Sequence, residues 1–366
     1  MKNGNEPKRC QHSEKALGRL SSTDRLHFFS GPGPSMRLLS VLSRTAGSVY
    51  PEATWDDRLA RIKYVVRALS APRATARWFA LLASPDLAGC AAAHPRLYSK
   101  LQRPYLHRRS TVGDRLAVLQ EHYWFLVRQI GPQARQALYT SATGIELAGL
   151  PASDPGRYSL RLRYDDQFEK EGELIALIHD ATSDTAVFTI AFTITAWSET
   201  RRELFIGGLQ GRKGANDRDD IVRLTRSLHG LRPKALLLFV VQCLARRWDI
   251  GRLRAVGDSE HIYRHFRKRR AIHASYDAFW EESQGLRDPD GNHTLPAQPT
   301  VRRIDELPAN KRALYRKRYE MLEELGAAIL RNLHFAEPVA PRPARPAALV
   351  SPPLRQTAPS ADPVSR

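Results

Sequence analysis

The sequence predicts an α+β fold, in which a helical N-terminal region precedes a mostly antiparallel sheet flanked by helices. Three observations support this prediction. Between residues 36 and 150, apolar residues recur at the spacing of helices. From about residue 150 the period changes to that of strands. After about residue 215 the helical spacing returns.

In the N-terminal region, helices are expected at residues 57–69, 73–84 and 114–126. The first has apolar side chains at helical spacing: Leu59, Ile62, Val65, Val66 and Leu69. Asp114 is a suitable N-cap for the third. A basic loop that carries tyrosines, residues 96–105, lies between the second helix and the third.

The sheet is expected to contain four strands joined by short links, at residues 158–164, 173–178, 185–194 and 203–208. The first alternates in polarity, and the third is rich in β-branched and aromatic residues. Short links between strands favour an antiparallel meander.

Helices and short strands are expected to follow the meander. The helices lie at residues 221–228, 233–248, 276–282 and 309–333, and the strands at 252–256 and within 292–305. Asn216 or Asp217 can cap the first of these helices, and Pro233 suits the first turn of the second.

The pattern divides the chain into four parts. Residues 1–35 are a disordered extension, residues 36–150 a helical region, residues 151–335 an α+β core, and residues 336–366 a proline-rich disordered tail. Met36 begins a cleaner apolar pattern, so both Met1 and Met36 stay open as the start.

Two features favour a cytoplasmic protein. The first residues are polar and lack the apolar core of a secretion signal. The longest apolar run, residues 235–241, is far shorter than the roughly 20 residues that a membrane span needs. A peripheral position at the inner membrane stays open.

The chain is strongly basic, with a formal charge of +19. This charge favours anionic partners, which include nucleic acid, acidic lipid surfaces and phosphorylated cofactors. It does not choose among them, and a charged surface that serves only solubility is the alternative. No known nucleic-acid motif is present, so sequence-specific nucleic-acid binding is not expected.

A metal site and a disulfide framework are not expected. Cys10, Cys90 and Cys243 lie far apart and match no metal-ligand spacing. His261 and His265 share a helix face, but the dense basic run around them favours an anion or a lipid surface over a metal.

Residues 207–214, Gly-Gly-Leu-Gln-Gly-Arg-Lys-Gly, are predicted to form a basic glycine turn after the fourth strand. Glycine allows the backbone to approach a ligand closely. The turn lacks the Gly-Lys-Ser/Thr of a Walker A loop. The alternative is a glycine bulge with a solvent turn. The cofactor-binding candidates are Gln210, Gly211, Arg212, Lys213 and Gly214.

Residues 229–234, His-Gly-Leu-Arg-Pro-Lys, open the most apolar helix of the chain. Arg232 and Lys234 add to the positive end of the helix dipole instead of compensating it. Cations at this position become favourable when an anion such as a phosphate binds there. Arg232 and Lys234 are therefore further cofactor-binding candidates, and a capped helix with solvated charges is the alternative.

The order of strands, basic glycine turn, helix, strand and helix is similar to N-acetyltransferase-like folds, which bind the pyrophosphate of coenzyme A at such a turn. The Gln/Arg-x-x-Gly-x-Gly/Ala signature of those folds is only echoed by residues 210–214. His229 is the candidate general base, because histidine titrates near neutral pH. A hydrogen-bonded structural histidine is the alternative.

Several segments resemble the VirK/YbjX family of bacterial proteins, also called DUF535. They are residues 205–211, 229–234 and 276–282, together with the shorter motifs Arg103-Pro104-Tyr105 and His122-Tyr123. The resemblance covers roughly residues 60–330. It implies a role in envelope-related virulence and in resistance to cationic antimicrobial peptides in Gram-negative bacteria. It carries over no catalytic residues.

Three functions remain open from the sequence. The first is an acyltransferase-like enzyme that acts on an envelope component and takes a phosphate-bearing donor, such as coenzyme A or an acyl carrier. The second is a non-enzymatic protein that binds an anionic lipid surface. The third is nonspecific nucleic-acid binding, which only the charge supports.

Overall fold

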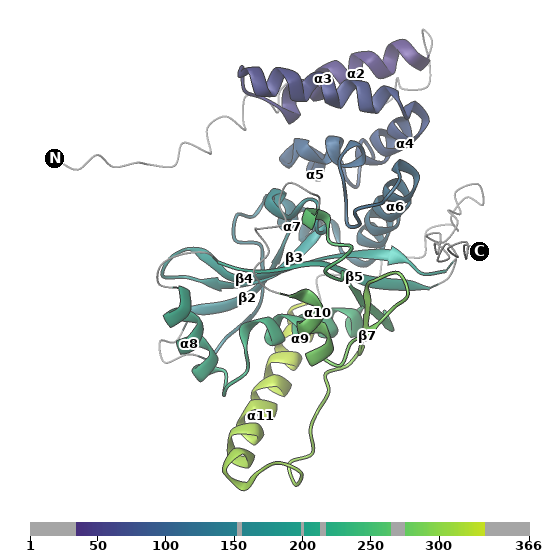
Figure 1. The fold of residues 1–366 in the computed structure, drawn as a ribbon. Helices are drawn as coiled ribbons and strands as arrows, with labels where there is room; N and C mark the ends of the chain where they lie inside the picture. Colours follow the sequence, from purple (N-terminus) through teal and green to yellow (C-terminus); the bar gives the residue numbers. More distant parts are fainter. Residues whose placement is uncertain (1–33, 152–155, 199–200, 213–216, 265–274, 334–366) are drawn as a thin grey trace, which may run out of the picture. The chain divides into compact units, whose positions relative to one another are not determined.

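The computed structural model describes residues 34–151, 156–198, 201–212, 217–264 and 275–333. The chain forms two compact units, of which one ends at Arg103 and the other begins at Pro104. Both are drawn in Figure 1. The two segments predicted to be disordered lie outside the described residues, except for Pro34 and Ser35.

The first unit is built from short helices. They are α2 (Pro34–Val49), α3 (Trp55–Leu69), α4 (Pro72–Leu82), α5 (Ala88–Ala93) and the 3-10 helix η4 (Pro95–Gln102). Thr54 caps α3, because its hydroxyl accepts a hydrogen bond from the backbone N–H of Asp57 at 3.2 Å. Trp78 is fully buried and donates from Nε1 to the carbonyl of Leu97 at 2.9 Å, which ties α4 to η4.

The second unit contains a mixed sheet. Its strands are β1 (Ile145–Gly149), β2 (Tyr158–Arg163), β3 (Leu174–Asp180), β4 (Thr185–Ala196), β5 (Arg202–Gly211), β6 (Arg252–Ala255), β7 (Leu286–Arg287) and β8 (His293–Leu295). Within the described ranges the sheet has eight strands in the order β1-β2-β3-β4-β5-β6-β8-β7. All neighbours are antiparallel except β5 and β6. The predicted meander, β2 to β5, is confirmed, and β1 extends it by one strand that the sequence pattern did not predict.

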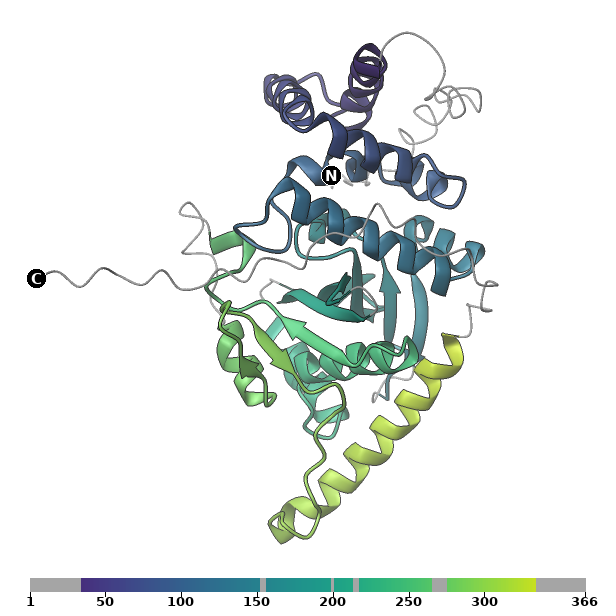
Figure 2. The same ribbon diagram turned by 90° about the vertical axis from the view of Figure 1, so that its right-hand side faces the viewer.

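Helices cover both faces of the sheet. They are α6 (Val112–Gln129), α7 (Pro132–Thr140), α8 (Asp217–Ser227), α9 (Pro233–Arg247), α10 (Tyr276–Glu282) and α11 (Ala309–Asn332), with 3-10 turns η5 (Asp166–Phe168) and η6 (Ile262–Arg264). Figures 1 and 2 show α6 and α7 on one face and α9 on the other. Since α9 packs against the sheet and against α11, it is apolar nearly all round.

Two boundaries differ from the sequence-based expectation. The units divide at Arg103 instead of near residue 150, because α6 packs on β4 and α7 on β1 and β2. The N-cap of α6 is Thr111 instead of Asp114, whose carboxylate accepts the backbone N–H of Thr111 at 2.9 Å as the third residue of a capping box. Packing and cap geometry, which period alone does not encode, set these boundaries.

Strands β5 and β6 pair in parallel, with α8 and α9 in the connection between them. Their register runs only from Glu203 opposite Arg252 to Ile206 opposite Ala255. Beyond that point β5 continues to Gly211, and the hydroxyl of Tyr276 takes the place of a strand partner, 3.2 Å from both the N and the O of Leu209. The parallel pairing therefore ends in the middle of β5, because β6 ends at Ala255.

Candidate functional site

The glycines at the start of the predicted turn lie inside strand β5. The expected turn at residues 207–214 therefore begins later than predicted, because β5 continues to Gly211. A Cβ on Gly207 would lie 2.0 Å from the carbonyl oxygen of Glu171, and one on Gly208 would lie 2.7 Å from the carboxyl carbon of the same residue. Ala191 pairs with Gly208 and Phe192 with Ile206, so Gly207 is the extra residue of a bulge. Both glycines make room for Glu171.

Glu171 is the centre of a closed polar cluster. It is fully buried, and both carboxylate oxygens accept hydrogen bonds from Gln210 Nε2, at 2.9 and 2.7 Å. His261 Nε2 lies 3.1 Å from the first of these oxygens. The backbone N–H of Tyr263 donates to His261 Nδ1 at 3.3 Å, which leaves Nε2–H as the donor to Glu171. Gln210, a predicted cofactor ligand, thus has a structural role here.

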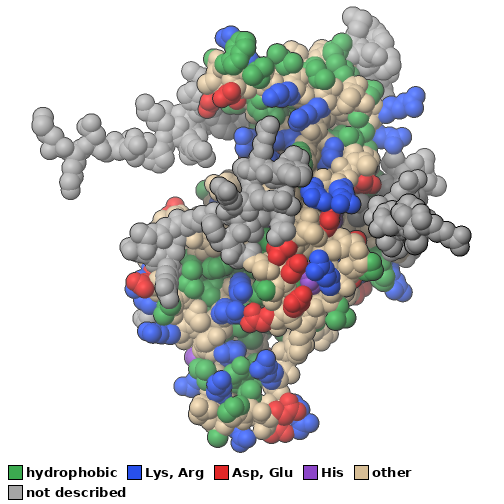
Figure 3. Space-filling view, viewed as in Figure 1, with side chains coloured by type: hydrophobic (Ala, Val, Ile, Leu, Met, Phe, Trp, Pro, Cys, Tyr) green, Lys and Arg blue, Asp and Glu red, His purple; other side chains and the backbone are tan. Residues whose placement is uncertain are grey.

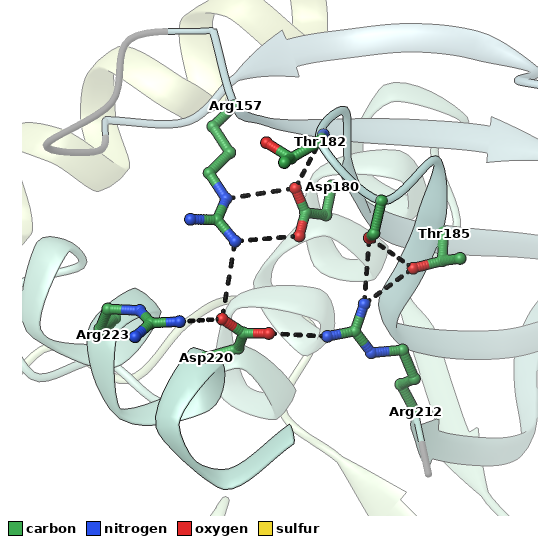
Figure 4. Close-up of polar contacts among 8 residues, drawn as sticks. Arg157, Asp180, Thr182, Thr185, Arg212, Asp220 and Arg223 are labelled. Atoms are coloured by element: carbon green, nitrogen blue, oxygen red, sulfur yellow. Dashed lines mark hydrogen bonds and ion pairs between the residues drawn. The ribbon is translucent and has the colours of Figure 1, made fainter. Parts of the chain in front are cut away.

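Arg212 belongs to a network of ions around Asp220 (Figure 4). Its guanidinium contacts Asp220 Oδ2 at 2.8 Å, and it also donates to the hydroxyl of Thr185 at 2.8 Å. Arg157 bridges Asp180 and Asp220, at 3.2 and 3.5 Å, and Arg223 contacts Asp220 as well.

Gly211 ends β5, and its Cβ position would lie against the ring of Phe188. The other two candidates, Lys213 and Gly214, lie outside the described residues.

The turn before α9 receives a counter-ion from α10. Arg232 is the N-cap residue of α9 and forms an ion pair with Glu282 of α10. The anion expected at this helix start is thus supplied, at least in part, by the chain itself. Lys234 Nζ lies over the ring of Phe279, 4.3 Å from its centroid. Burial lowers the pKa of Lys234, and the charge of Arg232 lowers it further.

His229 shapes the end of α8. Its backbone is left-handed, with φ of 51°, and its carbonyl accepts hydrogen bonds from Arg318 Nε and Nη2 at 3.0 and 2.8 Å. Asp220 lies near the start of α8 and His229 just after its end. A helix of 11 residues is about 16 Å long. Arg212 therefore contacts the start of α8, whereas His229 follows the opposite end of the same helix.

A small pocket that the sequence did not predict lies beside the N-terminal half of β5, and its volume of about 10 Å³ is close to the room that one water molecule needs. It is bounded by the segment before α6, the first turns of α6, and strands β4 and β5. The residues that matter for its chemistry are Tyr105, His107, Ser110, Thr195, Glu203 and Phe205. The imidazole of His107 lies 4.7 Å from the ring of Phe205, and Ser110 Oγ donates to the carbonyl of Tyr105 at 3.0 Å.

Glu203 is a buried carboxylate on the wall of this pocket. Its Oε1 accepts a hydrogen bond from the hydroxyl of Thr195, its partner on β4, at 3.0 Å. Its Oε2 accepts no hydrogen bond among the described residues, and Arg252 Nη1 lies 3.6 Å from it. Burial raises the pKa of Glu203, although Arg254 and Arg252 act in the opposite direction. One carboxylate oxygen is thus hydrogen-bonded, while the other is buried and has only the ion pair with Arg252.

His107 complements Glu203 on the pocket wall. Burial, followed by the charge of Arg254, lowers the pKa of His107 to about 4. The imidazole is therefore neutral at pH 7. A carboxyl group with a raised pKa beside a histidine with a lowered one is typical of sites for acid–base chemistry. A sequence signal did exist, because Glu203 is the one acid in the otherwise apolar run of residues 203–208.

Two further findings concern metal ions and membranes. Among the residues that the structure describes, no three His, Cys, Asp or Glu side chains are grouped so that they could hold a metal ion. In the same ranges, no helix combines the length and the apolar character that crossing a membrane requires.

The fold and the pocket define a basic α+β protein whose mixed sheet carries a small pocket lined by His107 and the buried Glu203. The chain matches the family described as "Protein of unknown function (DUF535)" over residues 53–331, and it belongs to that family. It is 34% identical to "Uncharacterized protein YbjX" of Escherichia coli (strain K12) over 299 residues. This match covers 80% of this chain and 90% of that protein. An uncharacterized protein of Haemophilus influenzae is 27% identical over 228 residues, 62% of this chain and 73% of that protein. The resemblance to the VirK/YbjX family noted from the sequence is confirmed.

Proposed function

We propose that the protein is an acyltransferase-like enzyme whose acceptor reacts in the pocket beside β5. The observation that carries the proposal is the carboxylate of Glu203, which is buried on the pocket wall, has a raised pKa and has no hydrogen bond to Oε2 among the described residues. A carboxylate with a raised pKa is a stronger base than an exposed one, which suits proton removal from an amine or a hydroxyl.

The topology supports the same reaction class. An antiparallel meander leads into a strand that pairs in parallel with the strand after the next helices, and this pairing ends after Ile206. This order agrees with the N-acetyltransferase-like arrangement expected from the sequence, and we include that arrangement in the proposal as a fold-level analogy.

The proposed step transfers an acyl group from a thioester to a nucleophile. The nitrogen or oxygen of the acceptor attacks the acyl carbon, so that a C–N or C–O bond forms and the C–S bond breaks. The proton of the acceptor passes to Glu203 Oε2, while Thr195 holds Oε1. The thiolate leaves and takes a proton from water. His107 is neutral and borders the reacting groups.

The donor would bind through its phosphates. Lys234 is the strongest remaining candidate, because Gln210 and Arg212 are held by Glu171 and Asp220, and Arg232 pairs with Glu282. Lys234 lies in the first turn of α9, where the free backbone N–H groups would also bind a phosphate. Gly211, Lys213 and Gly214 stay part of the proposed donor site. An envelope component as acceptor would agree with the role in virulence and in resistance to cationic antimicrobial peptides that the resemblance implies.

The experiment separates donor binding from turnover. Titration calorimetry with coenzyme A measures binding, and thiol release from an acyl-coenzyme A, with water as acceptor, measures turnover. Glu203→Gln is expected to lower turnover about 100-fold or more with unchanged binding. Lys234→Glu is expected to weaken binding. Glu146→Gln, an exposed acid on β1, is the matched control.

His229→Gln is tested in parallel, since His229 is the base that the sequence suggested. Loss of turnover in His229→Gln but not in Glu203→Gln would move the base to His229. Absence of coenzyme A binding by the wild-type protein would remove the proposed donor.

A further inference from the structure

Helix α3 turns an apolar stripe away from its own unit. The stripe consists of Trp55, Leu59, Ile62, Val66 and Leu69. Their spacing of four, three, four and three residues places them on one side of the helix. Trp55, Ile62 and Val66 are 70%, 61% and 60% exposed. The helix is predicted from four of these residues together with Val65, yet the stripe is not the face that packs.

The packed face of α3 is a different one. Tyr64 and Ala68 are buried, and the hydroxyl of Tyr64 lies 3.0 Å from Thr45 Oγ1 on α2. Arg61 donates from Nη2 to the carbonyl of Tyr50 at 2.6 Å and to that of Glu52 at 2.9 Å. These contacts fix the rotation of α3, so the stripe is presented outward by a helix that is held in place.

Basic side chains border the stripe. Arg58, Lys63 and Arg67 are exposed and lie between its members in sequence. The acids of α3, Asp56 and Asp57, are confined to its first turn, and Asp57 accepts the backbone N–H of Glu52 at 2.9 Å. Figure 3 shows hydrophobic side chains next to Lys and Arg side chains over the region of α2 and α3.

We propose that this face of α3 docks on an anionic lipid surface and lies in the plane of that surface. A helix with aromatic and aliphatic residues on one side and basic residues beside them is typical of interfacial helices. The apolar side chains would enter the boundary between headgroups and acyl chains, where tryptophan is favoured. The three basic side chains would meet the anionic headgroups. At 15 residues, about 22 Å, the helix is long enough to lie on the surface but too short to span it.

Charge favours lipid over a second copy of the chain. Two copies that met through this stripe with their helices parallel would bring Arg58, Lys63 and Arg67 near the same residues of the partner, and like charges repel. An anionic surface neutralises all three. The whole chain, at +19, is also attracted to such a surface.

The test is vesicle co-sedimentation of the full chain. The vesicles contain phosphatidylethanolamine with phosphatidylglycerol, and vesicles of phosphatidylcholine alone serve as the uncharged comparison. Ile62→Asp/Val66→Asp is compared with Leu286→Asp/Val301→Asp, in which the replaced residues are 73% and 64% exposed but lie in the second unit. Because other basic segments attract all variants equally, the ratio of the two affinities is the readout.

We expect the α3 variant to bind the anionic vesicles about tenfold or more weakly than the control variant, since two aliphatic side chains no longer enter the lipid. Arg58→Glu/Lys63→Glu/Arg67→Glu should lose most of the salt-sensitive part of the binding. Circular dichroism melts of all variants confirm folding, because the replaced residues are exposed.

Equal vesicle affinity of the α3 variant and the control variant would overturn the proposal. So would light scattering that shows a wild-type dimer broken by Ile62→Asp/Val66→Asp without a change in vesicle binding, since the occupant would then be a second copy.

Discussion

The carbonyl oxygen of Glu171 fills the space that a side chain on Gly207 would need, because a Cβ there would lie 2.0 Å away. The glycine pair of β5 therefore accommodates the chain itself. We predict that Gly207→Ala lowers the free energy of unfolding by about 3 kcal/mol, near the upper end for an overpacked site. Gly149→Ala, where a Cβ meets nothing within 4 Å, should change it by less than about 0.5 kcal/mol. Urea denaturation measures both, and similar values for the two variants would contradict this role.

Gln210 should behave as a structural residue. Gln210→Ala removes both hydrogen bonds to the buried carboxylate of Glu171. We expect a loss of about 2 kcal/mol in the free energy of unfolding, since the carboxylate is left short of donors. Coenzyme A affinity, measured on the folded variant, should stay unchanged. A large loss of affinity with unchanged stability would instead support the cofactor role suggested by the sequence.

Asp220 should contribute more to the free energy of unfolding than an exposed ion-pair partner does. Asp220→Asn leaves Arg157, Arg212 and Arg223 close together without their shared carboxylate. We expect destabilisation of about 2 kcal/mol in thermal or urea unfolding. Asp305→Asn, which breaks a surface pair with Arg303, should have no measurable effect. If both substitutions are silent, the network does not order the start of α8.

His107 should make stability depend on pH. In the unfolded chain histidine takes up a proton near pH 6.5, whereas folded His107 does so near pH 4. Protonation therefore favours unfolding, and the contribution of His107 is present above pH 6.5 and lost as the pH falls toward 4. His107→Gln should flatten this part of the profile. Unfolding profiles of the variant and the wild type that run parallel through this window would show that His107 is not held neutral.

Local patterns predicted most elements because period and composition act over short distances. The strand at residues 203–208 and the helix at residues 309–333 were both found this way, and α11 ends within one residue of the prediction. The sequence pattern could not show why residue 207 is a glycine, because Glu171, which occupies the space of a side chain there, lies on another segment. For the same reason the sequence could not show which face of α3 packs.

The site residues show a similar division. Cations at the start of α9 are favourable when an anion lies nearby. For Arg232 this anion is the carboxylate of Glu282, which lies far along the chain. The pocket depends on register, because the pairing of β4 with β5 sets Thr195 opposite Glu203. His107 joins them from a loop before α6. Long-range packing of this kind is not readable from a single sequence.

The central claim, that Glu203 is the base of an acyl transfer, is tested most directly by the pH dependence of thiol release from an acyl-coenzyme A. If Glu203 is the base, the wild-type rate rises with pH through a midpoint above the ordinary pKa of glutamate, because the base must be ionised. Glu203→Gln should be about 100-fold slower and should lack this rise. Thiol release with the same rate and pH profile in both proteins, or none in the wild type, would contradict the claim.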